Sequence, residues 1–379
     1  MRRKALGVGV SVAAVMAAVA CWRVEPVRGA TVTTAGWSQT AAASYLDSRE
    51  VWWEQWPHAK KEQGTMCISC HTQVPYEMVR PGLEKRLGES AAPAAETVML
   101  ASVEKRVAGW STMLPFYQDD ISGEGAAAKS HATEAMQNAI ILTYFDLGHG
   151  HLRPITRTAF DEAWALQEKT GELAGGWIWQ DFHMGPWEGD ESGYQGTALF
   201  LKAVEDAPDH YADEPGVREQ TAKLEGYLRA HYAEQPVLNQ LYVMWASGEA
   251  KDVLPKADRE ALLVKVRGLQ QADGGWCLSA MDKTERKDKT PQSTESDGYA
   301  TGLVVLAMEA GGAGKHDAVI GRGVAWLEGH QDATGRWPAS SINKHRDLDS
   351  DVGKFMSDAA TSYAVMALEK VKAEWSTSR

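Results

Sequence analysis

The residues best suited to chemistry lie in one short motif, C-I-S-C-H. Cys67 and Cys70 are one helical turn apart, and His71 follows directly. Two thiols at this spacing can add to the two vinyl groups of a haem, and the adjacent imidazole then faces the iron as proximal ligand. The alternatives are a reversible disulfide or half of a zinc site, although the sequence shows no second ligand pair nearby. The motif predicts one covalent haem c held by Cys67, Cys70 and His71.

The second iron ligand is predicted from spacing. Met113, in T-M-L-P-F-Y, lies 42 residues after His71. This stretch resembles the distal methionine region of small c-type cytochromes, which implies that Met113 is the sixth ligand. Met78, Met99 and His131 compete with it. An open distal position is a further alternative, and it would favour oxygen or peroxide chemistry over simple electron transfer.

A second group of chemically useful residues fills the stretch 175–194, G-G-W-I-W-Q-D-F-H-M-G-P-W-E-G-D-E-S-G-Y. Indole faces beside carboxylates suit an isoprenoid, a sugar or a cation. The alternative is a tryptophan-anchored turn with a solvated acidic loop. We predict a substrate pocket lined by Trp179, Trp187, Glu188 and Tyr194.

Acidic residues also recur where helices are expected to begin: Glu134, Glu191, Glu295, Asp297 and Asp358. Carboxylates favour helix N-termini, so capping explains them without any chemistry. If the helices run parallel around a barrel, the same side chains converge on one entrance. The catalytic candidates from this pattern and from the loop are Asp181, Asp190, Glu191, Asp297 and Asp358, and the sequence does not choose among them.

The elements that must position these residues form a repeat. From about residue 95 apolar residues recur three and four apart between Gly- or Pro-marked breaks, which predicts helices and almost no strand. The pattern Q-x-x-x-G-x-W occurs at 270–276 and 331–337, and a looser copy runs from Gln167 to Trp177. Each copy precedes an apolar helix rich in small residues, beginning near Gly193, Gly298 and Ala359.

These repeats resemble the QW-repeat family of squalene and oxidosqualene cyclases and protein prenyltransferase β-subunits. The resemblance implies an all-α fold, an α/α toroid of helix pairs over residues 95–379, in which Trp177, Trp276 and Trp337 fasten the outer helices. It does not imply the reaction. The D-x-D-D acid of hopene-type cyclases is missing, and so are the prenyltransferase zinc ligands and the complement-type thioester, so squalene cyclase activity is disfavoured.

The N-terminus predicts export. A basic start and a short apolar run end in A-V-A at residues 18–20, which indicates a cleaved signal peptide over residues 1–20. Cys21 follows directly, so a lipid anchor there is the alternative, and it would be the only contact with a membrane. We expect a linker over 21–45, the haem-attachment segment over 46–94 and the toroid thereafter. The predicted location is periplasmic or otherwise extracytoplasmic.

Composition agrees with a large core. The chain has 379 residues, 44% of them hydrophobic, and a net charge of −12, which excludes a mainly disordered protein and argues against a nucleic-acid partner. Tryptophan is in excess, with 15 Trp against 11 Tyr and 6 Phe, and the repeat accounts for part of it.

The leading function is therefore an exported c-type haem protein whose toroid holds an apolar, isoprenoid-like molecule or a glycan beside the redox centre, with an electron-transfer protein as partner. The first alternative is a non-redox enzyme, a terpene cyclase or lyase that uses the toroid cavity. The second is a ligand-binding module without chemistry. Whether the protein is an enzyme stays open; oxidoreductase is the class that the haem motif favours.

Overall fold

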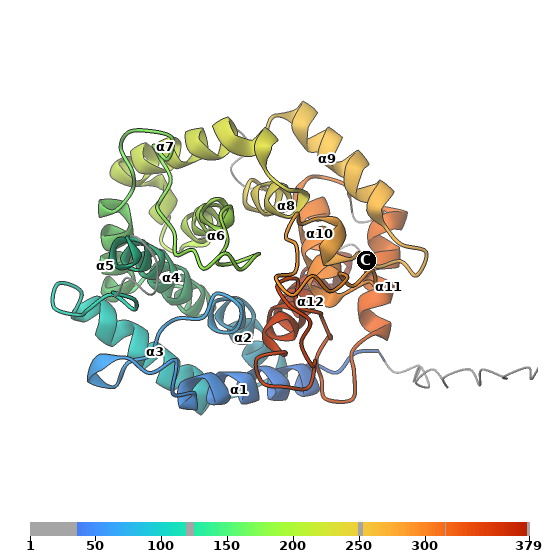
Figure 1. Cartoon of the computed structure of the whole chain (residues 1–379), viewed down its shortest axis with the longest axis horizontal. Coiled ribbons are helices and arrows are strands. Elements are labelled where there is room, and N and C mark those ends of the chain that lie inside the picture. Colours follow the sequence, from blue (N-terminus) through green and yellow to red (C-terminus); the bar gives the residue numbers. More distant parts are fainter. Residues whose placement is uncertain (1–35, 119–124, 249–252, 315, 377–379) are drawn as a thin grey trace, which may run out of the picture. The chain divides into compact units, whose positions relative to one another are not determined.

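A computed structural model describes residues 36–118, 125–248, 253–314 and 316–376. The predicted signal peptide and Cys21 lie outside these residues. The described chain belongs to one compact unit, Gly36–Arg379, and Figure 1 shows its helices arranged as two concentric rings. The described part holds twelve α-helices and no β-strand, only two isolated bridges. The predicted fold class, an α/α toroid, is confirmed.

The inner ring consists of six helices, which pack against one another in chain order, and the last of them, α12, closes the ring against the first, α2. Small and apolar residues permit this packing. In α10 every residue from Gly298 to Met308 is buried, and a Cβ on Gly302 would lie 2.6 Å from the backbone of Tyr363 on α12. The six inner helices are α2 (Gln73–Leu87), α4 (Ala126–His149), α6 (Ser192–Asp206), α8 (Val237–Ala246), α10 (Gly298–Ala310) and α12 (Phe355–Ser376).

The outer ring alternates with the inner one along the chain. Several of its helices are amphipathic and bury one face only, as α9 does with Leu262, Leu263 and Val266. The outer helices are α1 (Gln39–Gln55), α3 (Ala94–Ala108), α5 (Pro154–Ala165), α7 (Pro215–His231), α9 (Lys256–Leu269) and α11 (Ala318–Gly329). Short 3-10 turns lie in the connections, at Glu62–Gly64, Tyr211–Asp213, Tyr232–Glu234 and Leu278–Ala280.

Three QW-type motifs fasten the outer ring in one common way. In each, the glutamine amide donates to the carbonyl of its own glycine and to a backbone carbonyl at the next contacted outer helix. The indole N–H donates back to the helix just completed. The loose copy at Gln167 makes the same bonds as the two sharp ones, so its four extra residues do not disturb it. We call these three units the staples; their tryptophans are Trp177, Trp276 and Trp337.

The third staple closes the outer ring. Gln331 Nε2 donates to Ser38 O at 3.0 Å, and Ser38 N donates back to Gln331 Oε1 at 2.6 Å. Gly335 has a φ of 95° and packs against the backbone of Ala41 so closely that a Cβ would lie 2.1 Å from its carbonyl oxygen. The motif therefore joins the end of α11 to the start of α1, 293 residues earlier.

The segment before residue 95 is part of the ring. Because Ser38 caps α1 by accepting from Ala41 N at 3.1 Å, the helix begins at Gln39, and residues 39–45, expected in a linker, are helical. The predicted haem segment 46–94 supplies the rest of α1 and all of α2, the first outer and inner helices. Among the described residues, no helix combines the length and apolar character needed to cross a bilayer.

Candidate functional site

The C-I-S-C-H motif lies at the end of the inner ring where α2 begins. Ala59 O accepts a hydrogen bond from Cys67 N at 2.7 Å, and Trp53 Nε1 donates to Cys67 O at 2.9 Å. Two residues after the motif, Gln73 starts α2. The motif is therefore held by backbone bonds on one side and by an inner helix on the other, so its side chains have fixed positions.

The two thiols face different surroundings. Cys67 packs with Trp53, Ala59 and Met66 in a small apolar cluster. Cys70 accepts a hydrogen bond from Gln137 Nε2 at 2.7 Å and lines a cavity inside the inner ring. Burial raises the pKa of Cys67 to about 11 and raises that of Cys70 well above its usual value, so both remain neutral thiols at pH 7.

His71 Nδ1 contacts two hydroxyls. It lies 2.9 Å from Thr72 Oγ1 and 2.9 Å from Ser69 Oγ, and the Thr72 hydroxyl donates to Asp358 Oδ2 at 2.8 Å. Because the threonine proton is used on the carboxylate, Thr72 Oγ1 can accept from Nδ1–H, and in that tautomer the lone pair resides on Nε2. Burial lowers the pKa of His71 to about 3, so the ring is neutral. This arrangement, with the second nitrogen oriented by hydroxyl and carboxylate, is typical of metal-ligating histidines.

Asp358, a catalytic candidate, anchors this network. It lies in the first turn of α12 and is buried. Its Oδ1 accepts from Tyr45 OH at 2.7 Å and from Arg49 Nε at 2.8 Å, so the carboxylate connects α1 with the motif. Burial raises its pKa, and Arg49 opposes that shift. Asp358 thus acts on His71 through Thr72.

Aromatic rings enclose His71. Phe355 stacks on the imidazole with centroids 3.9 Å apart, and Trp53 meets it edge-on at 5.3 Å. The third ring is Trp187, from the predicted pocket loop, at 5.5 Å. The two regions that the sequence singled out separately, 67–71 and 175–194, are therefore in contact. Trp52 and Trp56 extend the same aromatic group.

The loop also brings a carboxyl group to the thiols. Burial and the nearby charge of Asp181 raise the pKa of Glu188 to about 7, and the charge of Glu188 raises the pKa of both cysteines. Trp179 Nε1 donates to Trp187 O at 2.8 Å and lines the Cys70 cavity beside Trp187. Trp179, Trp187 and Glu188 therefore gather at the motif.

Tyr194 lies apart from them. Its hydroxyl donates to Leu228 O at 2.7 Å, and its ring faces Tyr227 on α7. Tyr194 is on the side of α6 that packs against the outer ring, so it fastens two helices, and Gln195 is the neighbour that lines the cavity.

The remaining acidic candidates have separate surroundings. Asp297 caps α10, accepting from Ala300 N at 2.8 Å and Leu278 N at 2.7 Å, and burial raises its pKa to about 6. Glu191 precedes α6 and lines an open cavity on the surface. Glu134 forms a buried ion pair with Arg106. Capping accounts for Asp297, as predicted. The prediction that Glu134 begins a helix is wrong, because α4 begins at Ala126 and Glu134 lies eight residues inside it, paired with Arg106.

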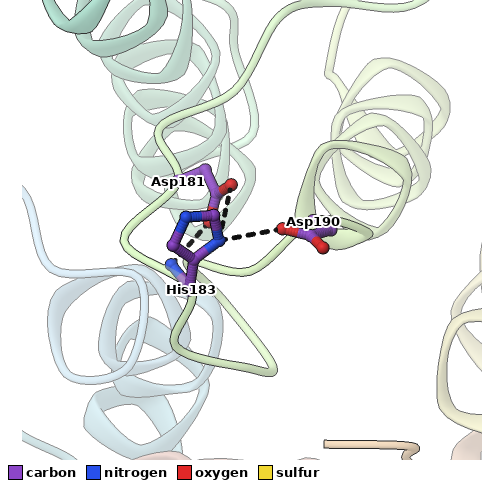
Figure 2. Close-up of side chains that lie close together, drawn as sticks. All are labelled: Asp181, His183 and Asp190. Carbon is purple, nitrogen blue, oxygen red and sulfur yellow. Dashed lines mark hydrogen bonds and ion pairs between the residues drawn. The ribbon is translucent and has the colours of Figure 1, made fainter. Parts of the chain in front are cut away.

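Asp181 and Asp190 lie together, on either side of His183 (Figure 2). His183 Nδ1 is 3.3 Å from Asp181 Oδ2 and 3.1 Å from Asp190 Oδ1.

Met113, the predicted sixth iron ligand, packs on Gly109 at the end of α3. The side chains that pack on the imidazole of His71 are instead Phe355, Trp53 and Trp187.

Sequence reasoning missed four contributors: Thr72, Gln137, Tyr117 and Phe355. Thr72 directly follows the motif, so its hydroxyl could have been predicted to contact His71. Gln137 and Phe355 lie on other helices, so no pattern near the motif indicated them. Tyr117 and Cys67 each shift the pKa of the other.

Three tyrosines of the inner ring form a hydrogen-bonded cluster next to Trp187. Tyr242 OH lies 2.6 Å from the hydroxyl of Tyr299 and 2.6 Å from that of Tyr363, joining α8, α10 and α12. Trp187 stacks on Tyr299 with centroids 5.6 Å apart. Burial raises the pKa of all three tyrosines, so they are neutral hydroxyls at pH 7.

Comparison with known proteins supports the toroid resemblance. The family model of the squalene-hopene cyclase C-terminal domain matches residues 236–371, which run from α8 into α12. A solved polysaccharide lyase shares 11% identity, with 90% of this chain and 92% of that chain covered and a TM-score of 0.38. No curated protein matches. The segment 236–371 is thus similar to the squalene-hopene cyclase C-terminal domain, and the described chain is an all-α toroid.

Proposed function

We propose that the chain is an exported haem protein in which the C-I-S-C-H motif holds one haem c covalently at the end of the inner ring. The observation that supports this most is the contact of His71 Nδ1 with the Thr72 hydroxyl, which donates to Asp358; with the proton on Nδ1, Nε2 would carry the lone pair. Because burial lowers its pKa to about 3, the imidazole is neutral at pH 7 and has one unprotonated nitrogen, as an iron ligand requires.

The donor set suits such a group, since both cysteines are free thiols, as thioether formation requires, and they lie among aromatic and apolar side chains. The cavity beside Cys70 is only about 20 Å³ and Phe355 stacks on His71, so a bound haem would require these rings to move. The haem would supply a one-electron redox centre. The protein's own contribution is to hold the thiols and Nε2, to keep the imidazole neutral, and to place Trp187 and Glu188 beside them.

The toroid adds a ligand site to this proposal. An isoprenoid-like molecule is the class of ligand we propose, with an electron-transfer protein as the partner outside. The cavity next to Cys70, lined by Gln137, Trp179, Trp187 and Gln195, is about 20 Å³ and holds about one water, so such a ligand would have to displace the two indoles.

The test is a pyridine haemochrome spectrum of the full chain, made with a cytochrome c maturation system. We expect one covalent haem per chain, lost in the double variant Cys67→Ala/Cys70→Ala. Cys277→Ala, which removes a cysteine outside the motif, is the matched control and should retain it. A chain that carries no haem while Cys67 and Cys70 react freely with an alkylating agent after unfolding would overturn the proposal.

A second variant tests the orienting network. Asp358→Asn removes the charge behind Thr72 while its shape persists, so covalent attachment should continue and the reduction potential should change. Asp297→Asn, a buried carboxylate at the start of a different inner helix, should leave the potential unchanged. Equal shifts in both variants would contradict a specific role for Asp358.

A non-redox cyclase or lyase is the second candidate. The observation that favours it is the buried group of Tyr242, Tyr299 and Tyr363, three neutral hydroxyls that could hydrogen-bond a substrate, within the stretch that matches the cyclase family model. Incubation of the chain with squalene and no redox partner tests it. Cyclic product that disappears in Tyr299→Phe and persists in Cys67→Ala/Cys70→Ala would favour this candidate over the haem protein.

A further inference from the structure

A second cluster of candidate ligand atoms lies on the pocket loop, apart from the His71 network. The imidazole of His183 is between two carboxylates, with its Nδ1 3.3 Å from Asp181 Oδ2 and 3.1 Å from Asp190 Oδ1. Figure 2 shows the three side chains pointing toward one another from a single loop. One ligand atom from each lies within 4.8 Å of the others.

The spacing of these atoms is that of ligands around one ion. Zinc binds imidazole nitrogen and carboxylate oxygen at about 2.0–2.2 Å, so neighbouring ligands of a tetrahedral ion are about 3.3 Å apart. The two distances from His183 Nδ1 are 3.3 and 3.1 Å. These two separations are those of ligands around one cation, and the two carboxylate atoms lie within 4.8 Å of each other.

The cluster opens onto a hollow. His183 and Asp190 are 76% and 80% exposed, and both line a surface cavity of about 290 Å³. Carboxylates of Glu191, Asp282 and Glu285 line the same cavity, with Lys283 as the single lysine among them. An ion bound here would keep open positions toward solvent, as ions do where they hold water or a substrate.

The three residues also bracket a small hairpin. Phe182 N and Met184 N both donate to Glu188 O, at 2.9 and 2.8 Å, and Glu188 N donates to Met184 O at 2.9 Å. Asp181 and His183 belong to the first arm, and Asp190 follows the second. An ion that joins them would fasten the arms of the hairpin that carries Trp187 and Glu188 to the C-I-S-C-H motif.

We propose that Asp181, His183 and Asp190 bind one divalent cation of the zinc class, and that this ion fixes the hairpin at residues 182–188. The donor set, one imidazole and two carboxylates, suits Zn²⁺ better than Ca²⁺ or Mg²⁺, which prefer oxygen ligands alone. The ion would neutralise the two carboxylates, which otherwise repel each other across His183. The site does not depend on the haem proposal.

The first experiment is a Zn²⁺ titration of the full chain after treatment with a chelator, followed by calorimetry. Since Cys67, Cys70 and His71 are also capable of binding zinc, the comparison is between variants in which that motif is intact. His183→Ala and Asp190→Asn should each lose one equivalent or bind it at least ten-fold more weakly. Asp282→Asn, a carboxylate of the same cavity outside the cluster, should bind as the unaltered chain does.

The second experiment identifies the ligands with Co²⁺. An ion on Asp181, His183 and Asp190 should show d–d bands without sulfur-to-cobalt charge transfer, because no thiolate is present. The proposal is overturned if His183→Ala binds as many equivalents as the unaltered chain, or if the Co²⁺ lost in that variant shows thiolate bands. The haemochrome spectrum should be the same in His183→Ala, so failure here leaves the haem proposal separately tested.

Discussion

The staples of the outer ring use side chains similar to those around C-I-S-C-H, at one end of the inner ring. The two regions use them for different purposes. In the staples, each glutamine amide and each indole N–H donates to a backbone carbonyl, so the polar groups serve only to join helices. Around His71, the Nδ1 nitrogen contacts the hydroxyls of Ser69 and Thr72, and Thr72 in turn donates to Asp358. We refer to this second region as the His71 end.

The difference shows how structure and function can be separated in a repeat protein rich in tryptophan. Trp337 and Trp187 are both buried, at 0% and 9% exposure. Trp337 donates to Leu327 O inside its own repeat, whereas Trp187 contacts the ring of His71 from a loop more than a hundred residues away in sequence. Bonds that recur in every repeat stabilise the fold, whereas the contact of Trp187 with His71 occurs once and marks the site.

The largest expected effect separates these two tryptophans. Trp337→Ala should lower the free energy of unfolding by about 3–5 kcal/mol, because it empties a fully enclosed site and leaves Leu327 O without its donor. Trp187→Ala should cost less, since it lies at the edge of a cavity, and should alter the surroundings of His71. Urea unfolding measures both. A larger loss for Trp187→Ala would reverse the assignment of the two residues.

A glycine pair tests whether the loose motif is a full staple. Gly175 and Gly171 both have positive φ, 94° and 79°. A Cβ on Gly175 would lie 2.2 Å from Lys223 O, whereas a Cβ on Gly171 would meet nothing within 4 Å. Gly171→Ala should therefore cost about 1 kcal/mol, for backbone strain alone, and Gly175→Ala about 2–3 kcal/mol. Equal costs in urea unfolding would mean that the close contact with α7 contributes nothing.

The opposite end of the barrel offers a third environment. There a cavity of about 520 Å³ is lined by residues from the C-terminal parts of all six inner helices, which fits a parallel inner ring. Its charged groups include the ion pair of Arg86 and Glu369, at 2.9 Å. Burial raises the pKa of Glu369 to about 7, with Arg86 opposing the shift.

This carboxyl group should make stability depend on pH. Its pKa is higher in the folded chain than the usual 4.5, so its stabilising effect is full below pH 4.5 and is lost as pH rises through about 7. Glu369→Gln should remove that loss. Between pH 5 and pH 8 the free energy of unfolding of the variant should therefore rise by roughly 1–2 kcal/mol relative to that of the unaltered chain. Glu219→Gln, exposed on α7, is the control. Parallel pH curves for Glu369→Gln and the unaltered chain would contradict the shift.

The fold could be predicted further than the site. The staples depend on residues 10 to 14 apart in sequence for their indole bonds, and the helical repeat shows in local periodicity, so pattern alone indicated the toroid. The contact between C-I-S-C-H and the loop at 175–194 depends on closure of the whole ring, which no local pattern encodes. The same closure explains why residues 46–94, expected before the toroid, supply its first helices.

Single side chains were harder still. Tyr194 and Gln195 are adjacent, and which of them faces the cavity depends on how α6 is rotated against α7. The structure turns Tyr194 toward Leu228 and leaves Gln195 inside. The stacking of Phe355 on His71 could not be predicted, because Phe355 belongs to the last helix of the chain.

The smallest expected effect compares two staples with the same bonds. Gln167 is 5% exposed and donates to Gly175 O and Gln220 O, whereas Gln331 is half-buried and donates to Gly335 O and Ser38 O. Truncation of either glutamine to alanine leaves two backbone carbonyl groups without their hydrogen-bond donor. Water can reach those near Gln331 but not the buried one near Gln167, so Gln167→Ala should cost about 1–2 kcal/mol and Gln331→Ala about half as much. A greater loss for Gln331→Ala would show instead that closing the ring at Ser38 stabilises the toroid more than burial does.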